Sequence, residues 1–262
     1  MKDKIDVQSL KDKRNITIDK VGVKNVRYPI IVEDRTNQIQ NTIADIDIYV
    51  ELPHHHRGTH MSRFIEVLNN FHKENFIHNL PEFLKEIKSA LNADAAYTVI
   101  RFPYFIKKYA PVSKTESLLS YNCFFEAFLK DEYELTIGVE VPITTLCPCS
   151  KEISEYGAHN QRSMVVLKVN FTEFVWLEEL IEIVESTASS EIYPLLKRED
   201  EKYVTEKAYN NPVFVEDIVR EITLILNKDN RIKFFQVESE NFESIHNHNA
   251  YACVSRQKEK LK

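Results

Sequence analysis

Two cysteines and one histidine within a short stretch are the residues of this sequence whose types and spacing best suit chemistry. Cys147 and Cys149 flank Pro148, and His159 follows at a distance that a loop can fold back across. A thiolate and an imidazole brought together can bind a zinc-type ion or form an activated nucleophile. Cys-x-Cys is not the Cys-x-x-Cys of zinc knuckles or redox centres, however. Taken alone, the motif is explained more simply by two buried cysteines beside a polar loop.

A second group of metal-binding residue types lies in the polar stretch 238–248. Glu243 and His246 are three residues apart there. A carboxylate with an imidazole can complete a metal shell begun by Cys147 and His159. One thiolate, two imidazoles and carboxylates together suit zinc, manganese or iron at an open, water-bearing site. This chemistry by itself predicts a metal-dependent hydrolase on a duplicated α+β scaffold.

Two further polar stretches allow both a structural and a functional interpretation. Residues 196–207 are dense in charges of both signs, which is as typical of a solvated linker between helices as of a binding segment. Glu216 stands in the first turn of an expected helix, where an acid can complement the helix dipole. Its two carboxylate oxygens can equally accept hydrogen bonds from paired N–H groups of a ligand.

The composition limits the class of protein. The 262 residues are 43% hydrophobic and 28% charged, which is typical of one large or two small globular domains. A net charge of −6 gives no support for binding to nucleic acid or to a membrane surface. The polar first residues, the lack of a long apolar run and four scattered cysteines predict a cytoplasmic protein without a disulfide framework.

Glycine is too rare for the usual nucleotide-binding loops. Only four glycines occur, and they lie far apart. That spacing excludes both the Gly-x-Gly-x-x-Gly turn and the Gly-rich phosphate loop. If the protein binds a nucleotide, side chains and helix ends must hold the phosphates.

Alternating and helical spacing of apolar residues predicts the elements that position these side chains. In the first half we expect strands over residues 21–32, 42–52, 96–105 and 118–129, and helices opening at 58–64 and covering 81–91. In the second half we expect strands over 133–146, 164–171, 232–237 and 249–254, and helices over 175–184 and 213–226. Each half thus reads strand, strand, helix, helix, strand, strand, an order that packs two antiparallel helices on one face of an antiparallel sheet.

This repeat of pattern predicts the domain organisation. Residues 1–18 are charged and aperiodic and are expected to form an N-terminal arm. A first module is expected over residues 19–130 and a second over 131–262, the second carrying most of the metal and substrate residues. The triplet His54–His56 could bind a metal, but a structural or incidental role is expected, because neighbouring side chains in a loop point in different directions.

Five longer strings make the sequence resemble one known family. They are the cysteine stretch from Thr144, Lys-Arg-x-Asp-Glu-Lys-Tyr-Val-Thr-Glu-Lys-Ala-Tyr from Lys197, Asn-Pro-x-Phe-Val-Glu-Asp from Asn211, Glu-Ser-Glu-Asn-Phe-Glu-Ser-Ile-His-Asn-His from Glu238, and Gly-Thr-His-Met-Ser-Arg-Phe from Gly58. Together they resemble the type IB GTP cyclohydrolase I family over nearly the whole chain. Glu199 departs from the family pattern, in which proline stands at that position.

The resemblance implies a fold, an assembly and a reaction. The fold is the tunnelling fold, with two tandem ββααββ modules per chain whose antiparallel sheets carry helices on one face and assemble into barrels. The assembly is a homotetramer with active sites at subunit interfaces. The reaction is hydrolysis of GTP to 7,8-dihydroneopterin 3′-triphosphate and formate, which begins tetrahydrofolate synthesis and in some bacteria feeds deazaguanine modification of tRNA. The implied cofactor is a divalent ion, with Zn²⁺, Mn²⁺ and Fe²⁺ as candidates.

Residue roles follow from the same resemblance. Cys147 and His159 are expected to bind the metal, with Glu201, Glu243 and His246 as further ligand candidates. Cys149 is the candidate for direct contact with the reacting purine and His246 for proton transfer, although the sequence leaves open which cysteine is the ligand. Glu216 is expected to bind the guanine N–H edge. The candidates for the triphosphate are cationic side chains, namely Arg162, Lys197, Arg198, Lys202 and Lys207.

Two other functions remain compatible with the same residues. A tunnelling-fold nitrile reductase also uses a cysteine and a purine-binding glutamate, but it would need a nicotinamide cofactor and would leave His159 and His246 without a role. A non-catalytic, zinc-stabilised assembly protein would unfold when its metal is removed. A catalytic site, in contrast, would lose activity with its fold largely intact.

Overall fold

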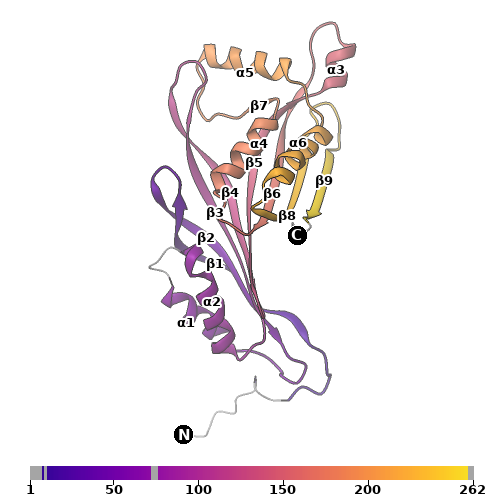
Figure 1. The fold of residues 1–262 in the computed structure, drawn as a ribbon. Coiled ribbons are helices and arrows are strands. Elements are labelled where there is room, and N and C mark those ends of the chain that lie inside the picture. The colour runs from indigo at the N-terminus through magenta and orange to yellow at the C-terminus, as the bar shows by residue number, and fades with distance from the viewer. Residues whose placement is uncertain (1–7, 9–10, 72–75, 259–262) are drawn as a thin grey trace. The chain divides into compact units, whose positions relative to one another are not determined.

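The computed structural model describes residue 8 and residues 11–71 and 76–258, and its elements form an α+β fold (Figure 1). The strands are β1 (Ile18–Asp34), β2 (Gln38–Leu52), β3 (Ala96–Tyr109), β4 (Glu116–Leu129), β5 (Tyr133–Leu146), β6 (Asn160–Phe171), β7 (Ser190–Glu191), β8 (Ile232–Asn241) and β9 (Ala250–Gln257). The helices are α1 (Met61–Asn70), α2 (Phe76–Leu91), α3 (Pro148–Ile153), α4 (Leu177–Thr187), α5 (Arg198–Asn210) and α6 (Val215–Lys228).

The first compact unit comprises Met1–Phe102 and Phe124–Leu135. Its strands follow the order β1-β2-β3-β4, and the pairs β1–β2 and β2–β3 are antiparallel. The helices α1 and α2 pack on each other and on β1, and α2 also contacts β2 (Figure 1). Apolar side chains alternate along β2, where Ile46 and Ile48 are fully buried. The helices present Phe64 and Leu84 to this core, also fully buried.

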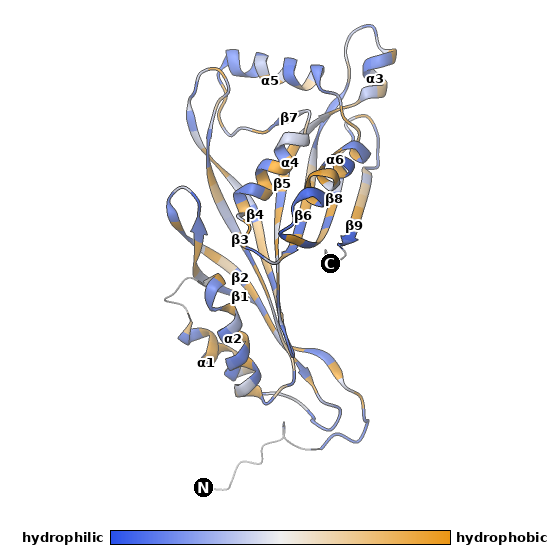
Figure 2. Ribbon diagram, in the orientation of Figure 1, coloured by the Kyte–Doolittle hydropathy of each residue, from blue (hydrophilic) through white to orange (hydrophobic). Residues whose placement is uncertain are grey.

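The second compact unit comprises Pro103–Cys123 and Thr136–Lys262. Its strands follow the order β3-β4-β5-β6-β8-β9, with the short β7 paired to β5. The pairs β5–β6, β6–β8 and β8–β9 are all antiparallel. The helices α4 and α6 lie together, α4 against β6 and α6 against β8 and β9 (Figure 1). Both helices are amphipathic, as the mixture of colours along them in Figure 2 shows.

The predicted α+β class is confirmed, and each half contains the expected strand, strand, helix, helix, strand, strand order. The second half adds α3, β7 and α5 to that order. The interpretation of residues 196–207 as a linker was wrong, because most of them form α5. That helix has few apolar residues and buries only Asp200 and Ala208, so the spacing of its apolar residues carries little helical signal. Helix α2 begins at Phe76 rather than at residue 81, because the buried Leu80 continues its apolar face.

The compact units and the predicted modules divide the chain differently. The outer ends of β3 and β4 belong to the second unit, although both strands were assigned to the module over residues 19–130. Compactness does not test a repeat, so the division into modules stays a prediction. Of the expected arm, residues 1–7 and 9–10 lie outside the described residues. The described part pairs with the loop after β2, where Gly58 N donates to Gln8 O and Asp12 N donates to His55 O.

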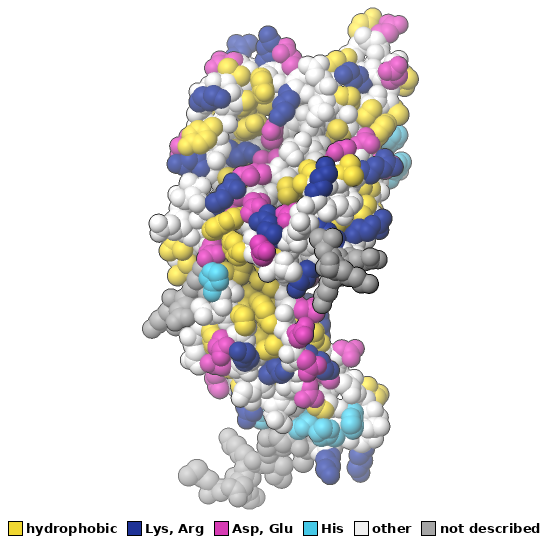
Figure 3. All heavy atoms as spheres, viewed as in Figure 1, with side chains coloured by type: hydrophobic (Ala, Val, Ile, Leu, Met, Phe, Trp, Pro, Cys, Tyr) yellow, Lys and Arg dark blue, Asp and Glu magenta, His cyan; other side chains and the backbone are white. Residues whose placement is uncertain are grey.

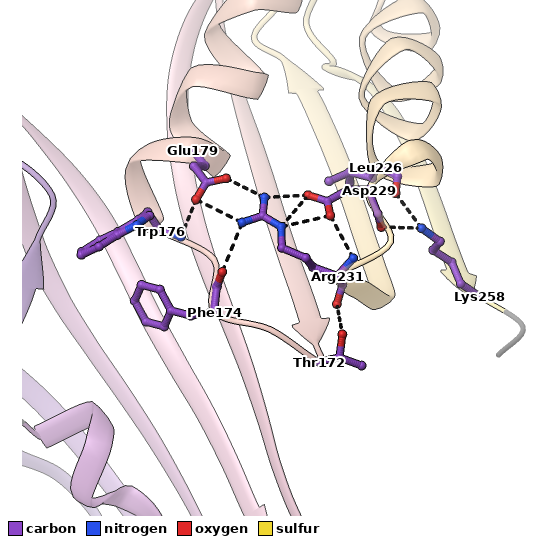
Figure 4. A network of polar contacts seen from close by, with 8 residues as sticks. All are labelled: Thr172, Phe174, Trp176, Glu179, Leu226, Asp229, Arg231 and Lys258. Carbon is purple, nitrogen blue, oxygen red and sulfur yellow. Dashed lines mark hydrogen bonds and ion pairs between the residues drawn. The ribbon is translucent and has the colours of Figure 1, made fainter. Parts of the chain in front are cut away.

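In the second unit, Arg231 joins helix α4 to the turn before β8 through a network of polar contacts (Figure 4). Arg231 Nη2 lies 2.6 Å from Glu179 Oε2 in α4 and 2.8 Å from Asp229 Oδ2 in the turn before β8. Arg231 Nη1 donates to Phe174 O. Planar guanidinium groups favour such bidentate pairs. The network therefore holds the start of α4 against the turn that leads out of α6.

The surface has no large field of one sign on the face shown in Figure 3, where Lys and Arg side chains are interspersed with Asp and Glu. This agrees with the net charge of −6. Among the helices of the described residues, none combines the length and the apolar composition needed to cross a membrane.

The β1–β2 pair contains a close backbone approach that only glycine permits. Gly22 pairs with Tyr49 across the two strands, and a Cβ at Gly22 would lie 1.9 Å from Ile48 O. We expect Gly22→Ala to force the strands apart and to lower the free energy of unfolding by about 1–3 kcal/mol, the range typical of overpacking. The denaturant midpoint of the purified variant measures this change.

Gly58→Ala is the matched control for that substitution. A Cβ at Gly58 has its nearest neighbour at 3.6 Å, an ordinary contact. We expect its midpoint to stay close to that of the unmodified protein. Equal loss of stability in both variants would contradict the steric explanation for Gly22.

Candidate active site

The β5–β6 hairpin brings the two central residues of the candidate site together. The last pair of its ladder is Leu146 with Asn160, so Cys147 and His159 are the next residues on the two strands. Cys147 N donates to His159 O over 3.1 Å, which extends the ladder by one bond. Because side chains alternate along a strand, both residues continue the face on which Thr145 and Gln161 stand. The predicted approach of a thiol and an imidazole in this stretch is therefore present in the backbone geometry.

The loop between these residues is shaped by α3 and by Ser150. Cys147 is the N-cap of α3, and its Sγ accepts from Ser150 N at 3.5 Å. Ser150 Oγ donates to Cys147 O and accepts from His159 N, each over 3.2 Å. One serine thus fastens both ends of the loop. Gly157, with φ of +129°, supplies the backbone turn back toward His159, a conformation open to glycine alone among the residue types.

Hydrogen-bond acceptors surround one nitrogen of the His159 ring. Nδ1 lies 3.0 Å from Gln161 Oε1, 3.4 Å from Ser244 Oγ and 3.9 Å from Glu243 Oε2. The stretch that holds Glu243 and Ser244 is brought there by β8, whose last residue Asn241 pairs with Ser163 of β6. The structure therefore places Glu243 beside His159, and the predicted role of Glu243 as a metal ligand stays a prediction.

Behind His159 lies a set of buried polar side chains that we call the polar row. It consists of Gln161, Thr145, Ser163 and Asn241, all between 0 and 7% exposed. Gln161 Nε2 donates to Thr145 Oγ1 over 2.9 Å, Thr145 Oγ1 and Ser163 Oγ are 2.8 Å apart, and Ser163 Oγ donates to Asn241 Oδ1 over 2.7 Å. The next inward position on β5, Ile143, is apolar and fully buried. The row is thus a polar end to an otherwise apolar core face.

Helix α5, which carries Glu201, is anchored at its first turn by Asp200. Asp200 is fully buried, and its carboxylate accepts from Val112 N, Ser113 N and Ser113 Oγ in the β3–β4 turn. It also accepts from Lys197 N at the start of its own helix. Burial opposes ionisation of Asp200, but these hydrogen bonds outweigh it and hold the pKa of the carboxyl well below its usual value.

The other end of α5 is tied to the cysteine stretch. Lys151 of α3 donates to Tyr209 O, and its Nζ lies 4.4 Å from the centre of the Tyr209 ring. After the helix, Val213 N donates to Leu146 O at the end of β5. Both contacts lie next to Cys147. They hold the C-terminal end of α5 beside the cysteine stretch.

The remaining predicted residues take no part in the hydrogen bonds described above for Cys147 and His159. Glu201 is exposed on the first turn of α5, and Glu216 is exposed on the first turn of α6. Cys149 is exposed on α3. His246 is exposed, and its ring stacks on that of His248 with 5.0 Å between the ring centres.

The candidates for the triphosphate differ in their surroundings. Lys207 pairs with Glu191, and Lys202 lies 3.8 Å from Glu206 one helical turn away. Arg162 is exposed on β6, and Lys197 and Arg198 are exposed where α5 begins. Four of the five candidates therefore belong to α5 or its N-cap. Their role in binding the triphosphate stays a prediction.

The candidate metal-binding side chains come together only in part. Within residues 8, 11–71 and 76–258, no three His, Cys, Asp or Glu side chains gather closely enough to form a metal site. Cys147 and His159 nevertheless suit a borderline-soft divalent ion, since Nδ1 of His159 faces acceptors and its Nε2 is left as the nitrogen for a ligand bond. The chain thus supplies two of the predicted ligands in one place, and the full set of five stays a prediction.

The histidine triplet belongs to the first unit, and the cysteine stretch belongs to the second. His55 and His56 line a cavity of 720 Å³ in the first unit, together with Lys88, Asp94 and Lys130. Lys130 Nζ pairs with Glu51 and Lys88 Nζ donates to Lys130 O. The structural or incidental role expected of the triplet stays a prediction.

Comparison with known proteins identifies relatives over almost the full length. The family model described as type I GTP cyclohydrolase folE2 matches residues 5–252. The chain is 56% identical to the GTP cyclohydrolase FolE2 of Geotalea uraniireducens, covering 97% of this chain and 93% of that protein. It is 57% identical to the GTP cyclohydrolase FolE2 of Magnetococcus marinus, covering 95% of this chain and 94% of that protein.

Solved structures show the likeness of fold. A crystal structure of the urate oxidase of Bacillus sp. TB-90 matches with a TM-score of 0.55 at 9% identity and covers 92% of this chain and 100% of that one. A highly active mutant of the same enzyme matches with a TM-score of 0.52 at 9% identity, with the same coverage. At such identities only the fold is shared. Because urate oxidase has the tunnelling fold, the predicted tunnelling fold is confirmed, whereas assembly into barrels stays a prediction.

Three positioning groups were missed from the sequence: Asp200, Ser113 and the polar row. Asp200 stands three residues after Lys197, the spacing of an acid that caps a helix start, and that spacing was the available signal. The polar row had a weaker signal. Thr145, Gln161 and Ser163 occupy positions of β5 and β6 that alternation assigns to the core, where polar residues are unusual.

The depressed pKa of Asp200 predicts how stability depends on pH. In the unfolded chain the carboxyl has its usual pKa near 3.8, and in the folded chain the pKa is lower. The folded state therefore gains stability from this group above about pH 4 and loses that gain as the pH falls toward the lower, folded pKa. We expect Asp200→Asn to lower the denaturant midpoint at neutral pH, and the difference from the unmodified protein to shrink below about pH 4.

The control is Glu199→Gln, which removes an exposed acid from the same helical turn. Its midpoint is expected to follow that of the unmodified protein from pH 7 to the acid limit of folding. If Asp200→Asn shifted the midpoint equally at every pH, the shift would not come from the ionised carboxylate.

Proposed function

The chain belongs to the family of type I GTP cyclohydrolases, and on this premise we propose that it hydrolyses GTP to 7,8-dihydroneopterin 3′-triphosphate and formate. The observation that carries the proposal is the position of Cys147 directly across the hairpin from His159. A thiol and an imidazole on paired residues at a strand end supply ligand types that a hydrolytic metal site needs. The site lies in the second unit, within the matched residues.

Cys147 and His159 would hold a divalent ion, with Glu243, Glu201 and His246 as the further ligand candidates. When bound, such an ion lowers the pKa of water and polarises nearby oxygens near neutral pH. The support in this chain is the acceptor set around His159 Nδ1, which includes Glu243. Whether zinc, manganese or iron fills the site is decided by the experiment below.

The substrate would be bound by the remaining candidate residues. Glu216 stands in the first turn of α6, exposed, with two acceptor oxygens that match paired N–H groups of a guanine. Arg162, Lys197, Arg198, Lys202 and Lys207 would bind the triphosphate. This use of side chains agrees with the scarcity of glycine, which excludes a phosphate loop.

The remaining functional statements rest on the family alone. A homotetramer with sites at subunit interfaces would supply ligands that one chain does not bring together, and it agrees with the two donors found beside each other here. The product would enter tetrahydrofolate synthesis, or deazaguanine modification of tRNA. The cytoplasmic location expected from the sequence stays a prediction. Because the matching family model is that of type I GTP cyclohydrolases, cyclohydrolase activity is favoured over nitrile reductase activity.

The proposal is tested with the full-length protein after removal of bound metal by a chelator. We expect no turnover of GTP in the chelated protein, and release of formate together with a fluorescent pterin when zinc or manganese is restored. Formate without pterin would limit the activity to ring opening. A folded protein without turnover under zinc, manganese or iron would contradict the proposal.

Single substitutions assign the cysteines. We expect the Cys147→Ser variant to lose its bound metal and its kcat to fall at least about 10²-fold, because no other group in the site can replace a catalytic metal ligand. Cys149→Ser is expected to keep the metal and lose kcat if that thiol contacts the purine. Cys253→Ser is the matched control, since Cys253 is exposed on β9 away from the loop. Metal content and kcat measured together separate the two roles, and metal loss with Cys149→Ser alone would reverse them.

A separate substitution tests the guanine contact. Glu216→Gln keeps the size of the side chain but removes one of the two acceptor oxygens. We expect kcat/KM for GTP to fall about 10- to 100-fold, the value of one hydrogen bond to a charged group. Glu221→Gln, an exposed acid of the same helix, is the control and should leave kcat/KM unchanged. Equal effects of the two variants would exclude Glu216 from substrate binding.

A further inference from the structure

The polar row ends on the candidate metal ligand, and the direction of its hydrogen bonds can be worked out from one end. Asn241 Oδ1 is a carbonyl oxygen and can only accept, so the proton between it and Ser163 belongs to Ser163 Oγ. A hydroxyl has a single proton. Ser163 Oγ must therefore accept from Thr145 Oγ1, which lies 2.8 Å away.

The same argument continues through the next two links. Thr145 has given its proton to Ser163, so its oxygen must accept from Gln161, whose Nε2 lies 2.9 Å away. With its amide nitrogen committed to Thr145, Gln161 turns its Oε1 toward His159 Nδ1, at 3.0 Å. A carbonyl oxygen requires a donor, so the proton of the neutral imidazole must sit on Nδ1.

The other neighbours of the ring agree with this assignment. Glu243 Oε2, 3.9 Å from Nδ1, is also an acceptor, and Ser244 Oγ at 3.4 Å is able to accept. A bare Nδ1 would instead direct its lone pair at the Gln161 carbonyl and at the Glu243 carboxylate. Because the members of the row are almost fully buried, water cannot replace a lost partner without a free-energy penalty.

We propose that Thr145, Ser163 and Asn241 act as positioning residues that hold Gln161 in one orientation, and that Gln161 in turn fixes His159 as the Nδ1–H tautomer with Nε2 bare. The inference rests on the proposed function, because a bare Nε2 is the form in which His159 binds a metal ion. It extends that function to residues that touch neither metal nor substrate. Partners of this kind typically change metal affinity about 10- to 100-fold.

The first test is the tautomer itself, measured in metal-free protein. Long-range ¹H–¹⁵N correlations of the labelled histidine rings distinguish Nδ1–H from Nε2–H, and the His159→Asn variant identifies the His159 signals among those of the nine histidines. The measurement is made at about pH 8.5, two units above the usual histidine pKa of ~6.5. We expect the Nδ1–H form. An Nε2–H form or a doubly protonated ring in the unmodified protein overturns the proposal.

The second test uses a matched pair at Thr145, which does not contact His159. Thr145→Val keeps the shape of the side chain and removes its oxygen, so Gln161 Nε2 loses its acceptor and the amide is free to turn over. We expect a mixed His159 tautomer and about 10- to 100-fold weaker zinc binding in competition with a chelator. Thr145→Ser keeps the hydroxyl and should retain both the Nδ1–H form and the zinc affinity.

A purely structural role for Thr145 predicts the opposite pattern. Both variants would lose thermal stability and neither would change the tautomer, and that result overturns the proposal, as does an equal loss of zinc affinity in both. If Thr145→Val fails to fold, the measurement on the unmodified protein still decides. Neither readout needs turnover of GTP, so an inactive protein with the Nδ1–H form supports the positioning role while counting against the proposed function.

Discussion

The candidate site depends on one backbone register, that of the β5–β6 hairpin. The ladder runs without a shift from Thr136 paired with Asn170 to Leu146 paired with Asn160. The next step of the same ladder is the bond from Cys147 N to His159 O. A slip of one residue in this pairing would place the two side chains on opposite faces of the sheet. The pairing of Cys147 with His159 is therefore a consequence of the strand register and does not require a dedicated contact between the two side chains.

The register is stabilised by side chains buried between the site and the core. Toward the core, the face that carries Cys147 continues into Ile143 and Val165, which are fully buried. Between the core and the site lies the polar row, in which three hydrogen bonds join Gln161, Thr145, Ser163 and Asn241. A buried polar group that loses its partner costs more than the bond contributes. The row thus favours one arrangement of its side chains over all others, and His159 stands at its end.

The helices contribute to the site in two different ways. Amphipathic packing holds α4 and α6 on the sheet, and the Arg231 network joins the start of α4 to the turn after α6 (Figure 4). Helix α5 has almost no apolar face and is held instead by polar contacts at its ends. At the start these are the bonds of Asp200 to the β3–β4 turn, and at the end they are the contacts of Lys151 with Tyr209. The helix with most of the predicted phosphate-binding cations is therefore positioned by electrostatics.

The sequence by itself determined the strands and the amphipathic helices, and it indicated Cys147 and His159 as candidate ligands. Alternation along β5 and the helical spacing of Ile218 and Ile222 arise from burial on one face, and such patterns are local. The longer strings also indicated the family, because Cys147 and His159 occur in a context too specific to be shared by chance. Helix α5 was not predicted from the sequence, because its capping and polar contacts leave no periodic pattern of apolar residues.

Only the tertiary structure decided which distant residues meet. Asp200 meets Ser113 and Glu243 meets His159 across separations of 87 and 84 residues (200 minus 113 and 243 minus 159), and no local pattern encodes such pairs. The polar row likewise needs β5, β6 and β8 side by side before its hydrogen bonds acquire a direction. The physical reason is that a hydrogen bond depends on position and orientation in three dimensions, whereas a sequence records only the residue types available to form it.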